Sequence, residues 1–290
     1  VGCGDIALRT VLLLQSHYRI FGLYRNLDGF KQARSNGIIP IYGDLDDRST
    51  LARLAGITQT VLHLAPPPNH GLRDTRTANL LSALTLQTKT HSRILPQRLV
   101  YISTSGVYGN CDGAFIDETH QVNPTSERAV RRVDAEIQIR QWGLRNYVSV
   151  SVLRVPGIYA ASRMPLARLR EGQPAILEEE DSYTNHIHAD DLAQIIYAAL
   201  RYARSGRVYH STDDSQLKMG RYFDLVADQF NLPRPPRITR EEAKVRIPPR
   251  MMSFMNDSRR LKNIRIKKEL YVKLRYPTVL DGIKAGAQSM

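Results

Sequence analysis

Short apolar runs alternate with longer segments of helical periodicity over roughly the first half of the chain. The runs are rich in Val, Ile, Leu and Tyr and predict strands at 19–24, 38–42, 60–64, 98–102 and 148–153. Helix-sized segments lie between or beside them at 5–16, 49–55, 75–88 and 126–142. Such alternation is typical of an α/β fold with a doubly wound parallel sheet and helices on both faces.

The pattern becomes looser after about residue 155. A helix is predicted from Asp190 through Leu200, a strand at 208–210 and a helix at 222–230, before a proline-rich turn at 232–236. We therefore expect residues 1–155 to form the main sheet domain. Residues 156–290 should form mostly a smaller lobe, with strands that return to the main sheet.

The chain opens with the pattern G-x-G-x-x-A, formed by Gly2, Gly4 and Ala7. The first glycine permits a tight turn, the second lets backbone approach a diphosphate, and the small third residue lets helix and strand pack closely. Asp5 and Ile6 open the following helix, whose free N–H groups attract anions. These residues predict a Rossmann-type dinucleotide site. Because the strand before such a motif is missing and no initiator Met is present, we expect the true N-terminus to lie upstream.

Arg25 directly follows the strand predicted at 19–24, which is the first strand after the glycine motif. An acidic residue there binds the ribose 2′-hydroxyl of NAD, whereas an arginine suits the 2′-phosphate of NADP. The sequence therefore predicts NADP as the cofactor, with NAD as the alternative, and a surface charge as the plainer interpretation of Arg25. Asp44, after the next strand, is expected near the adenine.

Three further segments share a family pattern: YISTSGVYG at 101–109, LRVPGIY at 153–159 and NHIHADDL at 185–192. Together with the glycine motif they resemble the extended short-chain dehydrogenases/reductases, the NAD-dependent epimerase/dehydratase family. The resemblance implies that Thr104 contacts the reacting hydroxyl or carbonyl. It also implies cofactor contacts near the strand ends, at Leu45, Leu64, Ala65, Pro66, Ser103, Pro156, Gly157 and Ile158.

The chain departs from the family at its catalytic pair. The family places Tyr eight residues, and Lys four, before the glutamate that corresponds to Glu136, and these positions hold Arg128 and Arg132. Arginine stays protonated in proteins and cannot replace a phenol as a proton shuttle. Arg132 is still expected to hydrogen-bond a ribose and Arg128 an anion; the alternative for both is a solvated helix face. Tyr183 and His186 are the candidate substitutes for the missing acid.

The net charge of +13 is concentrated in the basic segment, residues 234–275, which holds 14 Lys/Arg against 4 Asp/Glu. Such an excess favours a small anionic substrate, with the segment lining its cleft, although a solvated basic face explains it as well. The two cysteines make no disulfide framework and no metal site is expected. Both are expected to be reduced thiols of a cytoplasmic protein. No apolar run is long enough to span a membrane.

Two functions remain open. The first is an atypical NADP(H)-dependent oxidoreductase, similar to the epimerases and dehydratases, that transfers hydride to or from a carbonyl or alcohol of an anionic substrate such as a nucleotide sugar. The second is a catalytically inactive dinucleotide-binding redox sensor or regulatory protein. Nucleic acid is not expected as a partner, because charge alone is no binding motif. A homodimer is left open.

Overall fold

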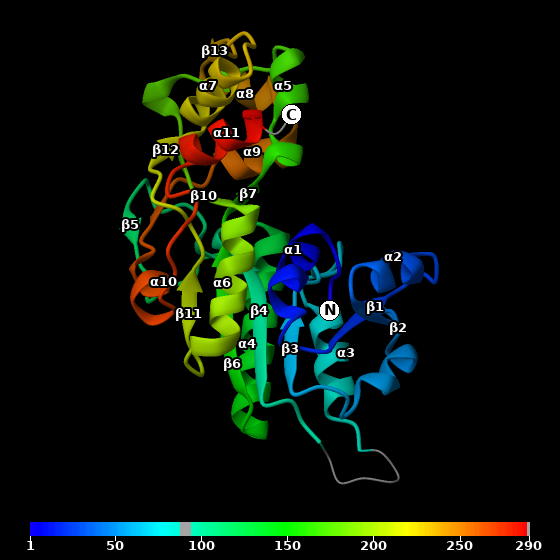
Figure 1. Ribbon diagram of the computed structural model, residues 1–290. Helices are drawn as coiled ribbons and strands as arrows, with labels where there is room; N and C mark the ends of the chain where they lie inside the picture. The colour runs from blue at the N-terminus through cyan, green and yellow to red at the C-terminus, as the bar shows by residue number, and fades with distance from the viewer. Residues whose placement is uncertain (88–93, 289–290) are drawn as a thin grey trace.

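The computed structural model describes residues 1–87 and 94–288 and is built around a parallel sheet (Figure 1). Four strands pair in the order β11-β6-β4-β3, all parallel. Their bounds are β3 Thr60–His63, β4 Arg98–Thr104, β6 Ser149–Val155 and β11 Val208–His210. β1 (Ile20–Tyr24) and β2 (Ile38–Tyr42) form a separate parallel pair. The predicted α/β parallel-sheet class is confirmed.

Helices cover both faces of this sheet (Figure 1). α3 (Thr75–Leu84) and α4 (Glu127–Asn146) pack through Leu80, Ile139 and Trp142 against one face. α1 (Asp5–Leu14) and α6 (Ala189–Tyr202) pack against the other face through Leu14 and Leu192. The two apolar layers bury the sheet on both sides, which explains why its strands read as nearly continuous apolar runs.

A cavity of about 490 Å³ lies between β1 and β3 and is lined by mainly apolar residues of both strands and of α1 and α3. Val1 reaches its edge. The Val1 nitrogen donates to the Leu62 carbonyl, and the Leu64 N–H donates to the Val1 carbonyl, each at 2.9 Å. Val1 therefore pairs with β3 as a residue of a parallel strand does, immediately before the glycine motif.

A second core lies apart from the sheet, in the upper part of Figure 1, and contains buried residues between Tyr159 and Ile283. Its helices are α5 Leu166–Arg170, α7 Met219–Gln229, α8 Arg240–Arg246, α9 Pro249–Met255 and α11 Val279–Gln288. We call this part the second lobe. The chain also returns to the sheet, since α6, β11 and α10 (Ile264–Glu269) pack there. The boundary at residue 155 stays a prediction.

Among the described residues, four further pairs of short strands lie outside the main sheet. They are β5 (Phe115–Ile116) with β14 (Arg260–Leu261), β7 (Gly157–Tyr159) with β10 (His186–His188), β8 (Ala175–Ile176) with β13 (Arg237–Ile238), and β9 (Tyr183–Thr184) with β12 (Leu217–Lys218). One of these pairs, β8 with β13, belongs to the core of the second lobe. Segments of 3₁₀-helix occur at η1 Arg48–Leu54, η2 Ser105–Tyr108, η3 Ala161–Arg163 and η4 Glu178–Glu180.

Some element predictions differ from the structure. The segment at 49–55 is the 3₁₀-helix η1, and α2 (Gly29–Ser35) was not predicted. The helix predicted at 75–88 ends at Leu84, and Thr88 lies outside the described residues. α4 continues past Trp142 to Asn146. A Cβ at Gly143 would lie 2.6 Å from the Val150 side chain. This glycine therefore allows close helix–strand packing rather than ending the helix.

Candidate functional site

The glycine motif forms a tight turn that leads into α1. Gly2 has φ +85°, and a Cβ there would lie 2.4 Å from the Ala65 nitrogen, so only glycine fits. Gly4 is the N-cap of α1, where no side chain of the described residues caps the helix. A Cβ at Gly4 would meet no described atom within 4 Å. The start of α1 is therefore uncapped, with open space beside Gly4, which fits a diphosphate group.

The carboxyl ends of β3, β4 and β6 lie at one edge of the sheet, because these strands are parallel and in register. This edge carries several of the predicted cofactor residues, from Leu64 to Pro66, Ser103, and from Pro156 to Ile158. The Ser103 hydroxyl is 3% exposed and has no hydrogen-bond partner among the described residues. A buried hydroxyl without a partner is costly, so a ligand atom at this edge fits it well.

Thr104 ends β4, and its hydroxyl accepts a hydrogen bond of 3.2 Å from the Gly106 N–H. It is half-buried, opposite Val155 in β6. This contact fixes the start of η2 and leaves the threonine hydroxyl hydrogen available. The placement is compatible with the predicted contact to a reacting oxygen.

The two arginines at the positions of the family's Tyr and Lys differ in their surroundings. Arg132 is half-buried, and its guanidinium donates to the Tyr101 hydroxyl (3.0 Å) and the Ile102 carbonyl (2.7 Å). Arg131 is buried and donates to the Gly71 carbonyl. A solvated helix face is therefore the wrong interpretation for Arg132. Arg128 is exposed, with its guanidinium 4.3 Å from the ring of Phe254 in α9.

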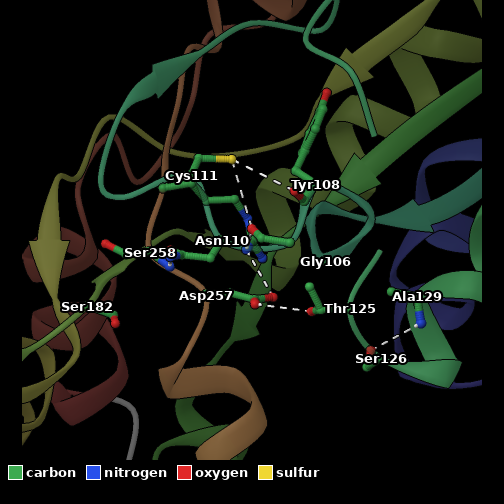
Figure 2. A network of polar contacts seen from close by, with 12 residues as sticks. Gly106, Tyr108, Asn110, Cys111, Thr125, Ser126, Ala129, Ser182, Asp257 and Ser258 are labelled. Atoms are coloured by element: carbon green, nitrogen blue, oxygen red, sulfur yellow. Dashed lines mark hydrogen bonds and ion pairs between the residues drawn. The ribbon is translucent and has the colours of Figure 1, made fainter. Parts of the chain in front are cut away.

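Polar contacts connect the start of α4 to the second lobe (Figure 2). The Ser258 N–H donates to the Asn110 side chain (2.9 Å), and the Thr125 hydroxyl donates to Asp257 (3.5 Å). The Ser258 carbonyl in turn accepts from the N–H of Cys111 (2.9 Å). Burial raises the pKa of the Cys111 thiol, so it remains protonated at neutral pH. These contacts hold the loop after η2 and the residues before α4 against Asp257 and Ser258.

The two candidate acids lie on neighbouring short strands. His186 is 5% exposed and packs at 4.3 Å against the ring of Tyr222. Burial lowers the pKa of His186 to about 4, so its imidazole is neutral at neutral pH and cannot donate as an imidazolium. Tyr183 is half-buried, and its ring lies 4.5 Å from the Arg260 guanidinium and 5.8 Å from the Lys218 ammonium.

The residues predicted to bind the adenosine lie at the ends of β1 and β2. Arg25 is exposed. The Asp44 carboxylate accepts from the Asp46 N–H at 3.0 Å. Arg76 donates two hydrogen bonds to Asp46 (2.8 and 2.6 Å), which together with the charge of Arg25 lower the pKa of Asp46. The contact of Arg76 with Asp46 was not predicted from the sequence, because nothing in the local pattern distinguishes Arg76 from a surface helix residue.

Sequence reasoning also missed Arg163 in η3. Its guanidinium forms an ion pair of 3.0 Å with Asp5, the first residue of α1. Asp5 additionally accepts from Arg9 (2.9 Å), and Arg9 pairs with Asp190 at the start of α6. The N-terminus of α1 is therefore surrounded by charged side chains from α1, η3 and α6.

The basic segment is not one patch of free cations. Six of its side chains form ion pairs, and two more donate to backbone carbonyls; they are Arg234, Arg237, Lys244, Arg259, Arg265 and Lys267, then Arg240 and Arg260. Arg259 and Arg260 reach the carbonyls of Gly109 and Gly113, in the loop after β4. Much of the excess charge is thus used within the fold. That the segment lines a substrate cleft stays a prediction.

The part of the chain that the structure describes contains no group of three or more His, Cys, Asp or Glu side chains placed to hold a metal ion. No helix in residues 1–87 and 94–288 combines the length and the apolar character that crossing a membrane requires.

The fold is similar to several solved structures over nearly the whole chain. A functionally unknown conserved protein from Silicibacter pomeroyi DSS is 28% identical, with a TM-score of 0.81 over 99% of this chain and 96% of that one. UDP-glucuronic acid 4-epimerase from Bacillus cereus, in complex with NAD, is 16% identical, with a TM-score of 0.76 over 99% and 95%. UDP-glucose 4-epimerase from Thermotoga maritima is 15% identical, with a TM-score of 0.76 over 99% and 96%.

A curated relative, an uncharacterized protein of Schizosaccharomyces pombe, is 28% identical over 149 residues. The match covers 44% of this chain and 40% of that protein, so the chain spans about two fifths of the relative's length. The sequence model of the NAD dependent epimerase/dehydratase family matches residues 8–211, which is more than half of the chain. The chain belongs to the NAD dependent epimerase/dehydratase family.

Proposed function

We propose that the chain binds a nicotinamide dinucleotide, with its diphosphate at the N-terminus of α1. The observation that carries the proposal is the uncapped start of α1 at Gly4, where a side chain would meet no described neighbour. The unpartnered Ser103 hydroxyl at the carboxyl end of β4 supports it. In doubly wound sheets, ligands bind at this edge.

The proposed activity is that of an atypical oxidoreductase of the epimerase/dehydratase type. The cofactor, when bound, supplies hydride transfer; the chain orients the substrate and protects the site from water. Thr104 would hold the reacting oxygen, and Arg128 would attract the anionic part of the substrate. A nucleotide sugar is the substrate class we favour, because the structural neighbours include epimerases named for UDP-sugars.

We infer a preference for NADP(H) from Arg25, the exposed cation at the end of β1. Replacing Arg25 with glutamine should weaken NADP⁺ binding about tenfold and leave NAD⁺ binding unchanged, because a charge-assisted contact to the 2′-phosphate is lost. Calorimetric titration with both cofactors measures this. If the variant binds the two cofactors as the wild type does, Arg25 is a surface charge only.

A second candidate is a non-catalytic dinucleotide-binding protein that reports redox state. The hydrogen bonds of Arg132 to Tyr101 and Ile102 favour it, since this side chain is held by β4 and offers no proton at neutral pH. Under this alternative, dinucleotide binding is retained and no substrate is turned over.

Turnover assays separate the two candidates. With NADPH and a panel of keto sugars and nucleotide sugars, an oxidoreductase should oxidise the cofactor or interconvert the sugars. Tyr183→Phe should then reduce kcat by a factor on the order of 10²–10⁴ if Tyr183 supplies the proton. His186→Gln is the companion variant, and we expect the smaller effect from it because the imidazole is neutral. Absence of turnover with every substrate, while the cofactor still binds, favours the sensor.

A further inference from the structure

Asp5 is a poor neighbour for a diphosphate. It stands in the first turn of α1, where its negative charge stabilises the helix. The same charge repels an incoming diphosphate, which itself carries about two negative charges. The site proposed above therefore requires a cation that offsets Asp5.

Two arginines contact Asp5, and they differ in how they are held. Arg9 lies on α1 itself and also pairs with Asp190 of α6, so its charge is shared between two carboxylates. Arg163 lies in η3, and Asp5 is its sole ion-pair partner among the described residues. The side chains of Arg163 and Asp5 are 37% and 36% exposed, but the Asp5 Oδ2 that pairs with Arg163 is itself buried, so solvent reaches this pair only in part.

The backbone around Arg163 belongs to the second lobe. Tyr159 and Met164, on either side of η3, are buried in the core of that lobe, and Ala160 is buried as well. Arg163 is thus fixed at its base and reaches across to the start of α1. A planar guanidinium binds phosphate through paired hydrogen bonds, and a single, partly exposed ion pair such as that with Asp5 is weak enough to be exchanged.

We propose that Arg163 is a cofactor-binding residue contributed by the second lobe, and that it contacts the diphosphate of the dinucleotide beside the Gly4 turn. This inference rests on the proposed function. On binding, the guanidinium exchanges part of its contact with Asp5 for the diphosphate, which draws the second lobe toward α1. The contact is made to the diphosphate, so it does not distinguish NAD from NADP by the ribose 2′-substituent.

The test compares three ligands on the full chain. NAD⁺ and NADP⁺ both contain the diphosphate, whereas 2′-AMP has the adenosine and the 2′-phosphate without it. Arg163→Gln should weaken NAD⁺ and NADP⁺ to a similar extent, about tenfold or more, and leave 2′-AMP unchanged. Arg25→Gln should give the opposite pattern, with loss of NADP⁺ and 2′-AMP only. Arg170→Gln, at an exposed arginine of α5, is the matched control and should change none of them.

Asp5→Asn distinguishes a ligand from a purely structural ion pair. If Arg163 serves only to hold Asp5, both variants break the same pair and should act alike, with a lower melting temperature and the same change in affinity. The proposal predicts opposite effects: Asp5→Asn binds NAD⁺ at least as tightly as the wild type, because the repulsion is removed. If Arg163→Gln binds both dinucleotides with wild-type affinity, the role of Arg163 is overturned while the proposed function stands. If the wild type binds no dinucleotide, the proposed function and the role of Arg163 are both overturned.

Discussion

Replacing Glu136 with glutamine should lower the free energy of unfolding by about 3–5 kcal/mol, because it leaves a buried guanidinium without its counter-charge. Glu136 accepts from the Arg154 Nε at 3.1 Å and from a terminal nitrogen at 2.7 Å, and both side chains are about 5% exposed. Arg154 also donates to the Tyr108 hydroxyl (2.7 Å), which lies 2.5 Å from His210 Nε2. The pair therefore anchors a polar network that connects α4, β6 and η2 through the core.

Urea denaturation at pH 7 measures this loss. Asp228→Asn, which breaks the exposed pair with Arg234, is the control and should have a far smaller effect. The double variant Glu136→Leu with Arg154→Met should recover much of the stability, because no charge is left buried. A loss no larger than that of the surface control would mean that water reaches Arg154.

Replacing Asp213 with asparagine should stabilise the protein, and by an amount that grows with pH. Asp213 is 2% exposed; one carboxylate oxygen accepts from the Ser215 N–H (2.9 Å) and the other has no described partner. Burial raises the pKa of Asp213 to about 8, and the nearby charges of Asp214 and Asp191 add to the effect. Tyr159 also faces it, and burial together with the charge of Asp213 raises the pKa of the Tyr159 hydroxyl, which is therefore neutral at neutral pH.

The direction follows from proton binding. Between pH 4 and pH 8 the folded state keeps the Asp213 proton and the unfolded state does not, so the wild type loses stability as the pH rises, by about 1.4 kcal/mol per unit at most. Asparagine has no proton to lose. The stability difference between variant and wild type should therefore increase from pH 4 to pH 8 and then stay level. Asp112→Asn, at an exposed carboxylate, is the control. A difference that does not change with pH would show that Asp213 is ionised in the folded protein.

Much of the sheet could be predicted from the sequence, for a physical reason. Strands buried on both faces are runs of apolar residues between polar turns, and the strands at 38–42 and 208–210 match the structure at both ends. Helix α2 was not predicted, because its seven residues, which begin at Gly29, are too few to show a helical period. The glycine turn was recognisable because steric limits on Gly2 leave a local pattern in the sequence.

The charged contacts could not be predicted in this way. Arg163 and Asp5 meet because the second lobe folds back onto the sheet, and no local spacing encodes that approach. The run of arginines in α4 suggested a solvated face, yet Arg131 is buried and Arg132 is bonded to β4. In the basic segment, composition revealed the excess of cations but not that Arg265 and Lys267 are paired with Glu118 and Asp214, carboxylates far away in the sequence.

Equilibrium dialysis of the wild type and of Gly4→Val with NADP⁺ and NAD⁺ tests whether a dinucleotide binds at the start of α1. The valine side chain points into space that is empty of described atoms, and Gly4 has an extended backbone conformation that valine adopts, so the melting temperature should change little. We predict that the wild type binds at least one dinucleotide and that Gly4→Val weakens it at least tenfold, because the side chain blocks backbone approach to the diphosphate. Equal binding by both proteins, or none by the wild type, would contradict the account.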